Sequence, residues 1–542
     1  MCHFSLIFGF VKLKKYHLIL IGLLGGVILS LGWPERGFPL LLFIGMVPFL
    51  YIEDYISENK QDFGRMAVFL YTYPGFLLWN VLTTWWIWNA TEAGSIAAFL
   101  LNAIFMSIVF QVYHFSKINR SSRQSYFILI FYWITFEYFH HNWDGNWPWL
   151  TLGNGFAAYI KWIQWYEFTG VFGGTLWILV TNIFIYLGIK GFFSKVINPW
   201  SNVVSAVLII LLPILVSVRM FNNYEETPAP VDVVVVQPNM DPYSEQFEIP
   251  PTDVVDTNLN LALKKLDANV DYIVSPESAI QERIWIGFEY NSPSLSKLRT
   301  FVIKHPGIQY IIGASTFYEF VEGDEITMTA RRFSDTNIYY DAYNTAFSIS
   351  DNGVIEHYHK SKLTPGVEKM PYPGVFKPIE RLAVNLGGTI GSLGTQAERS
   401  VFGRYDDTVK VAPVICYESV FGEYLTGYIR NGAHLIFVIT NDGWWGNTPG
   451  HRQHFTFSQM RAIETRRSVA RSANTGISAF INQRGEAFQE TEYWEPDVIR
   501  QRINANDEIT FYVKYGDYIA RISGFVAIFI LLIAIANKLR RR

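Results

Sequence analysis

The chain has 542 residues, of which 50% are hydrophobic and only 17% are charged. This composition is too apolar for an ordinary soluble protein, and the length allows several domains. The net charge of −3 gives no electrostatic reason to expect a nucleic-acid partner, so we set that class aside.

Eight apolar stretches are predicted to cross a membrane as helices, because each approaches the length needed to cross roughly 30 Å of hydrocarbon. The first follows three lysines, as a signal peptide does, but residues 30–35 make a poor cleavage site and six more stretches follow before residue 220. We therefore expect about eight spans, at 17–34, 38–52, 66–88, 95–115, 125–141, 168–189, 203–218 and 518–537.

Lysine and arginine are distributed unevenly between the ends of these spans. The short loops on one side hold only Arg36 and Lys161, although Arg219, Lys514 and Arg521 lie near span ends there. Because positive residues are retained in the cytoplasm, we expect both termini inside. The basic ends hold Lys12, Lys14, Lys15, Lys60, Arg65, Lys117, Arg120, Arg123, Lys190, Lys195, Lys538, Arg540, Arg541 and Arg542.

This topology predicts a membrane domain over 1–220, an extracytoplasmic domain over 221–516, and a last span with a basic tail over 517–542. The outer loop near 140–166 is rich in tryptophan, including Trp147 and Trp149. These rings form either a plain interfacial belt or the rim of a lipid site. Adjacent His140 and His141 rarely both bind a metal, and no cysteine or carboxylate cluster completes a site, so we predict no metal.

From residue 228 onward, short β-branched runs alternate with polar helical stretches, which indicates an α/β domain. Several strand pairs lack a crossover helix, so we expect two sheets covered by helices, an α-β-β-α sandwich. No glycine-rich phosphate-binding motif occurs, and no cofactor is implied. Predicted strands are 231–236, 272–274, 310–314, 346–350, 409–416, 434–440 and 477–482, and predicted helices are 253–267, 294–304 and 453–466.

Cys416 ends one of these runs and therefore lies at a strand tip, where open α/β folds expose reacting groups. The other cysteine, Cys2, precedes the first span, so we expect no disulfide between them. A lone buried thiol is more often inert than nucleophilic.

Charged residues at two other places offer what a reactive thiol needs, namely a base and a cation facing the oxyanion. Glu277 follows the strand at 272–274, and Lys360, Lys362 and Glu368 share one polar segment. Taken singly, these residues have ordinary explanations: a helix cap, a solvated lysine pair and a surface carboxylate.

In combination, these residues resemble the Glu-Lys-Cys triad of the nitrilase (carbon–nitrogen hydrolase) superfamily. The flanking sequence, together with the spans, looks like the apolipoprotein N-acyltransferase family. The resemblance covers nearly the whole chain, and the block 440–478 is the most specific part. The matching segments are 236–239, 343–346, Lys360 with 363–365 and Glu368, 416–418, 440–446, 453–454, 461–464 and 474–478.

The resemblance implies that Glu277, Lys360 and Cys416 are catalytic, and that Glu368, Tyr417 and Glu418 support them. It also implies acyl transfer from a membrane phospholipid, through a cysteine thioester, to the N-terminal amine of a diacylglyceryl-modified apolipoprotein. A monomeric enzyme of the bacterial cytoplasmic (inner) membrane is expected, with its catalytic domain on the periplasmic side.

The chain departs from the family pattern at two places. Gly366 and Val367 stand where the family usually has Phe-Gly, and the usual tryptophan after the first strand is missing near residue 247. Phe247, or Tyr243, is the candidate to replace that tryptophan against lipid.

Two other functions remain open at this stage. A membrane-bound amidase or nitrilase would use the same triad and hydrolyse the thioester, although eight spans exceed what a tether requires. A transporter with an appended domain would also have many spans, but ionisable residues are expected inside them, and these spans are almost free of charge.

Overall fold

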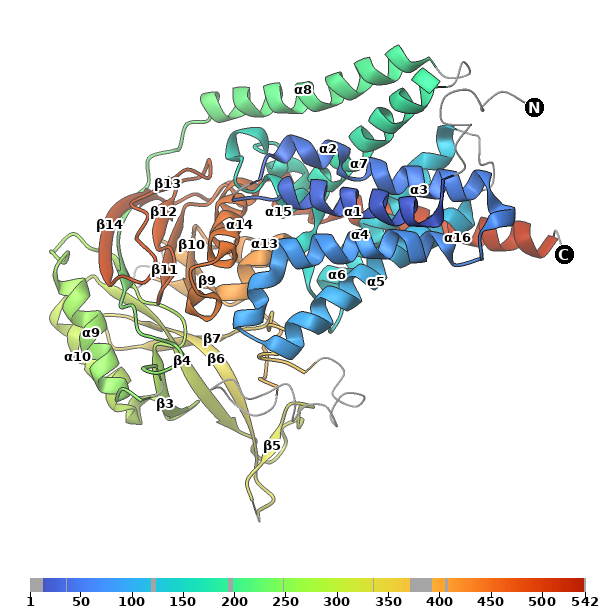
Figure 1. Ribbon diagram of the computed structural model, residues 1–542. Helices are drawn as coiled ribbons and strands as arrows, with labels where there is room; N and C mark the ends of the chain where they lie inside the picture. The colour runs from blue at the N-terminus through green and yellow to red at the C-terminus, as the bar shows by residue number, and fades with distance from the viewer. Residues whose placement is uncertain are drawn as a thin grey trace. The chain divides into compact units, whose positions relative to one another are not determined.

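The computed structural model describes residues 13–35, 37–117, 123–193, 198–246, 248–334, 336–370, 392–404 and 408–540. The chain divides into two compact units (Figure 1). The helical unit consists of Met1–Trp85, Ser95–Asn222 and Asp517–Arg542, and the α/β unit consists of Trp86–Gly94 and Asn223–Gly516.

Within the described part of the helical unit, a helix occurs at each of the eight predicted stretches. Among the described residues, five segments are long and apolar enough to cross a membrane: Pro39–Glu58, Glu92–Ser116, Tyr166–Phe193, Pro199–Asn223 and Tyr518–Arg540. The number of spans and their sidedness stay predictions. The helices are α1 (Lys15–Leu31), α2 (Leu42–Gly45), α3 (Val47–Glu58), α4 (Ala67–Thr84), α5 (Glu92–Ser116), α6 (Ile128–Asn142), α7 (Tyr166–Phe193), α8 (Pro199–Asn223) and α16 (Tyr518–Arg540).

Charge is less sparse in these helices than the sequence suggests, because α3 continues past residue 52 and carries Glu53 and Asp54, both buried. Lys117 Nζ lies 2.6 Å from Glu53 and 2.9 Å from Asp54, and Lys190 Nζ lies 2.6 Å from Asp54. Buried charges are tolerated when they are paired in this way. Sparse charge is therefore a weaker argument against a transporter than the sequence suggests.

The first sheet of the α/β unit has eight strands in the order β14-β1-β2-β4-β6-β5, with β3 paired to β4 and β7 paired to β6. β1, β2 and β4 are parallel. The bounds are β1 (Pro230–Gln237), β2 (Tyr272–Val274), β3 (Ile280–Trp285), β4 (Gln309–Glu319), β5 (Arg331–Arg332), β6 (Tyr339–Ile349), β7 (Ile355–His359) and β14 (Asp497–Asn504).

The second sheet has six strands in the order β13-β12-β11-β10-β9-β8, and β9, β10 and β11 are parallel. β9 and β10 are buried along nearly their whole length, which accounts for their Val/Ile-rich sequences. The bounds are β8 (Phe402–Gly403), β9 (Lys410–Ile415), β10 (Leu435–Thr440), β11 (Val469–Ala473), β12 (Ala479–Ile481) and β13 (Ala487–Phe488).

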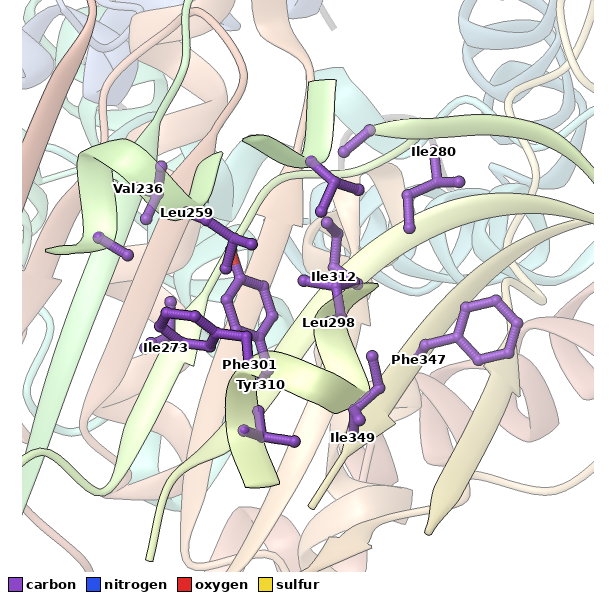
Figure 2. Packing of buried hydrophobic residues seen from close by; sticks show 14 of the residues in the cluster. Val236, Leu259, Ile273, Ile280, Leu298, Phe301, Tyr310, Ile312, Phe347 and Ile349 are labelled. Atoms are coloured by element: carbon purple, nitrogen blue, oxygen red, sulfur yellow. The ribbon is translucent and has the colours of Figure 1, made fainter. Parts of the chain in front are cut away.

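Helices cover the outer face of each sheet. α9 (Pro251–Leu263) and α10 (Pro293–Lys304) contribute Leu259 and Leu298 to a buried cluster with Val236, Ile273 and Ile312 of the first sheet (Figure 2). α13 (Gly422–Arg430) and α14 (Pro449–Thr465) pack on the second sheet.

The two sheets face each other. The rings of Tyr272 and Phe437 lie 5.2 Å apart, and the Ser472 hydroxyl donates to the Val236 carbonyl at 2.7 Å. The predicted α/β fold is confirmed, and the inner faces of both sheets form one core between the two helical layers.

One short segment that follows α4 belongs to the α/β unit by its contacts. The side chain of Trp86 is only 1% exposed, and its ring centroid lies 4.9 Å from that of Trp445. Asn89 Nδ2 donates to the Trp445 carbonyl at 2.8 Å, and the Tyr243 hydroxyl donates to the Asn89 carbonyl at 3.0 Å. The α/β unit is thus built from two separate parts of the chain.

Candidate active site

Cys416 directly follows β9, as the apolar run predicts, and its backbone adopts a left-handed conformation with φ of 48°. Burial raises the pKa of the Cys416 thiol, and the nearby charge of Glu277 adds to the rise, while Lys360 opposes it. The thiol therefore carries its proton at neutral pH, and a base must remove that proton before Cys416 can attack.

Glu277 lies three residues beyond the end of β2, and its carboxylate is held by three hydrogen bonds. Oε1 accepts from Lys360 Nζ at 2.9 Å and from Asn344 Nδ2 at 2.8 Å, and Oε2 accepts from the Asn441 backbone N–H at 3.1 Å. A Cβ at Gly313 on β4 would lie 2.6 Å from the Glu277 Cα, so only glycine leaves room for this approach. These three bonds hold the carboxylate in one orientation, with Oε1 directed toward the Lys360 amine.

Lys360 follows β7 and is only 2% exposed. Its amine lies 2.9 Å from Glu277 and 2.8 Å from Glu368. Burial alone would lower the pKa of Lys360, but these two carboxylates raise it well above its ordinary value. Burial likewise opposes the charge of Glu368, yet Lys360 holds the pKa of Glu368 below its ordinary value. The amine is therefore a permanent buried cation.

Glu418 connects the segments that carry the thiol and the amine. One oxygen accepts from the Ser361 backbone N–H at 2.7 Å and from the Tyr358 hydroxyl at 2.6 Å, and the other accepts from the Ile415 backbone N–H at 2.9 Å. Burial raises the pKa of Glu418. Since Ser361 and Ile415 are the neighbours of Lys360 and Cys416, this carboxylate fixes the spacing between both residues.

Lys362, two residues after Lys360, contacts aromatic rings. Its amine sits over the ring of Phe421 at 4.8 Å and over that of Tyr424 at 5.8 Å. Burial, with a further contribution from Arg399, lowers the pKa of Lys362 from 10.5 to about 8. The two lysines, which share one polar segment of the sequence, thus have different surroundings.

The remaining predicted site residues have varied environments. Tyr417 is buried, with its ring 5.1 Å from that of Phe421. Trp149 is fully buried in the core of the helical unit and stacks at 5.4 Å on the partly exposed Trp147. Phe247 lies outside the described residues, and Tyr243, the other candidate, is 53% exposed.

Three further polar residues near Cys416 received no role from the sequence. Asp442 and His454 offer ligand atoms that lie, with the Cys416 sulfur, within 4.8 Å of one another. The geometry resembles a metal site, but Arg471 donates to Asp442 at 2.6 Å and so already neutralises the carboxylate. The sequence signal for these residues was their position in the specific block 440–478.

Comparisons with known proteins agree with this α/β fold. A family model described as carbon-nitrogen hydrolase matches residues 233–510, just over half of the chain. The chain therefore belongs to the carbon–nitrogen hydrolase family. A second family model, described as apolipoprotein N-acyltransferase N-terminal domain, matches residues 25–184.

Two relatives match this chain along nearly the whole of both sequences. An apolipoprotein N-acyltransferase of Chlorobaculum tepidum is 27% identical over 95% of this chain and 96% of its own length. One of Geobacter metallireducens is 25% identical over 92% of each chain. A solved amidase from Nesterenkonia sp. covers 53% of this chain and 94% of its own, at 15% identity and a TM-score of 0.34. The resemblance inferred from the motifs is confirmed, and the apolar helices fit an integral membrane protein.

Proposed function

We propose that the protein transfers an acyl chain from a membrane phospholipid to the N-terminal amine of the S-diacylglyceryl-cysteine of apolipoproteins. One observation carries this proposal. A buried thiol at the tip of β9 shares its surroundings with the Glu277–Lys360–Glu368 cluster, in a chain that matches both the catalytic and the N-terminal family models.

In the first half-reaction, Glu277 takes the Cys416 proton and the thiolate attacks the ester carbonyl of the phospholipid. Lys360 and the Tyr417 backbone N–H stabilise the oxyanion, a contribution of about 3–4 kcal/mol per donor in comparable sites. The intermediate then expels the alkoxide of the lysophospholipid, which receives the proton from Glu277. The acyl chain remains on Cys416 as a thioester.

In the second half-reaction, the α-amine of the acceptor cysteine attacks the thioester carbonyl. Glu277 accepts the proton of the attacking amine, and the same two donors stabilise the oxyanion. Collapse forms the amide and releases the Cys416 thiolate, which recovers its proton from Glu277. Glu368 and Glu418 hold Lys360 and the nucleophile segment in place throughout.

The family and the basic-residue bias support a bacterial cytoplasmic (inner) membrane location, with 1–220 as membrane domain, 221–516 on the periplasmic side, and 517–542 returning to the cytoplasm. The proposed enzyme acts as a monomer and without a cofactor. Its partners are the membrane, the phospholipid donor and the modified apolipoprotein.

Intact-mass spectrometry after incubation of the purified protein with phospholipid alone tests the proposal. We expect a mass gain of one acyl group on Cys416, and none in a Cys416→Ala variant. A wild-type protein that acquires no acyl group would contradict the proposed function.

The same preparation separates the transferase from the alternative, a membrane-bound amidase or nitrilase-type hydrolase. Addition of a diacylglyceryl-cysteinyl peptide should discharge the thioester and yield an N-acylated peptide, whereas the peptide with a blocked α-amine should leave it intact. Release of free fatty acid at the same rate with and without peptide would identify a hydrolase.

A further inference from the structure

The backbone carbonyl of Cys416 is held on the side of α14. The Ser419 hydroxyl donates to this carbonyl oxygen at 2.7 Å. His454 Nε2 lies 3.1 Å from the same oxygen and 2.9 Å from the Ser419 hydroxyl oxygen. The Cys416 carbonyl, the Ser419 hydroxyl and the His454 imidazole therefore each contact the other two.

His454 is itself fixed by residues at two neighbouring strands. Its Nδ1 lies 3.0 Å from Asp442, which follows β10, and 3.1 Å from Arg471 on β11. Arg471 donates to the other Asp442 oxygen at 2.6 Å and to the Ser458 hydroxyl at 3.0 Å. All of these side chains are fully buried, so the imidazole is enclosed by its hydrogen-bond partners.

A peptide unit is planar, and its C=O and N–H bonds point in opposite directions. The carbonyl of Cys416 and the N–H of Tyr417 belong to the same unit. Fixing the carbonyl toward His454 and Ser419 therefore aims the Tyr417 N–H the opposite way. A left-handed conformation such as that of Cys416 is unfavourable for a residue with a Cβ, so it needs surrounding contacts to persist.

We propose that His454 and Ser419 are positioning residues that orient the Cys416–Tyr417 peptide unit, and thereby its N–H, as an oxyanion donor for acyl transfer. This inference rests on the proposed function. Asp442 and Arg471 act one step further away by fixing the imidazole. Hydrogen bonds to a carbonyl also polarise its peptide unit, which strengthens the N–H as a donor.

The competing role for His454 is that of a second base for the thiol, because the cysteine, histidine and aspartate lie close together. Alkylation by iodoacetamide distinguishes the two roles. Alkylation needs the thiolate but develops no oxyanion on a carbonyl. Acylation by an ester needs the thiolate and also stabilisation of the oxyanion. A positioning residue should affect only acylation, and a base should affect both.

The experiment compares His454→Phe with His454→Gln, because glutamine can place an N–H near the position of Nε2 and phenylalanine cannot. Acyl-thioester formation is followed by intact mass at saturating phospholipid, and alkylation is followed in parallel. We expect the His454→Phe protein to be acylated about 10- to 100-fold more slowly than the wild type. The phospholipid concentration that gives half of the maximal rate should change little. Alkylation should stay within about twofold, and His454→Gln should recover most of the acylation rate.

Ser419→Ala and Ser419→Thr form a second pair, which carries the test if His454→Phe fails to fold. Ser419→Ala should slow acylation about 10-fold, and Ser419→Thr, which keeps the hydroxyl, should not. Wild-type acylation rates in His454→Phe, parallel loss of acylation and alkylation, or no rescue by His454→Gln would each overturn the inference. A wild-type protein that forms no thioester would instead contradict the proposed function, so the two failures are distinguishable.

Discussion

Lys360 donates a hydrogen bond of 2.9 Å to Glu277, although 83 residues separate them in the chain. The same amine bonds Glu368 at 2.8 Å, so one buried cation lies between two buried carboxylates. Such a cation serves two purposes, because it stabilises negative charge on a reacting carbonyl and neutralises two anions that would otherwise repel.

The first prediction separates the paired lysines. Lys360→Ala should abolish thioester formation and lower the free energy of unfolding by about 3–5 kcal/mol, because it leaves buried carboxylates unpaired. Lys362→Ala should retain most of the activity, because Lys362 lies over aromatic rings away from that cluster. Thioester mass and thermal unfolding measure the two effects. The reverse pattern would assign the oxyanion role to Lys362.

The second prediction concerns the nucleophile. Cys416→Ser should fold with a melting temperature close to that of the wild type and lose acyl transfer, because a serine hydroxyl is a much weaker acid than a thiol. Turnover is measured with phospholipid and a diacylglyceryl-cysteinyl peptide. Retention of more than a small fraction of wild-type turnover would require another nucleophile.

A third prediction follows from the pKa of Lys362, which lies at about 8 instead of 10.5. Between these values the unfolded chain binds more protons than the folded one, so the free energy of unfolding should rise with pH. Relative to Lys362→Met, the wild type should gain stability between pH 8 and 10.5, by at most about 1.4 kcal/mol per pH unit. Denaturant unfolding at several pH values measures the difference, which should be constant below pH 7.

The tryptophan-rich loop near residues 140–166 gives a fourth prediction. Trp149→Ala should lower the free energy of unfolding by about 3–5 kcal/mol, because the ring is fully buried. The melting temperature should fall accordingly. Trp147→Ala should lower the free energy of unfolding by less than Trp149→Ala does. A lipid-rim role for Trp147 predicts that the same change slows acylation by phospholipid. Unchanged acylation in a stable Trp147→Ala protein would favour a plain interfacial belt.

Sidedness supplies a fifth prediction. Met328 in the α/β unit is 95% exposed, so a Met328→Cys variant offers an accessible thiol. A membrane-impermeant maleimide should label this thiol in spheroplasts from which the outer membrane has been removed. Lys538→Cys is the matched control for the opposite side. Labelling of Met328→Cys only after the inner membrane is opened would reverse the proposed orientation.

Some of the α/β unit was predictable because burial leaves a plain sequence signal. The strand at 272–274 was located to the residue, and Cys416 was placed correctly at the tip of β9, because both strands are apolar runs. β11 was missed because its five buried residues include Ser472 and Arg471, whose charge is paired with Asp442 only in three dimensions. β7 was missed for a similar reason, since Ile355 and Tyr358 are the only hydrophobic residues among its five.

The identities of the site residues were more predictable from the sequence than the contacts between them. Lys360 and Lys362 share one polar segment of the sequence, but β7 ends at His359, and beyond it one amine bonds Glu277 while the other lies over Phe421. The contact between His454 and the Cys416 carbonyl joins residues 38 positions apart, and no local pattern encodes it. Motif resemblance could identify such residues, but their roles required coordinates.

The segment Trp86–Gly94 determines which fragments contain the whole α/β unit and when during synthesis the unit can be completed. A fragment that begins at residue 223 would lack Trp86, whose indole lies where any side chain at Gly450 would be, and would leave an apolar gap beside Trp445. During synthesis, the strands emerge more than a hundred residues after this tryptophan. The α/β unit therefore completes its core with a segment that is synthesised much earlier, and residues 223–516 alone are only part of that unit.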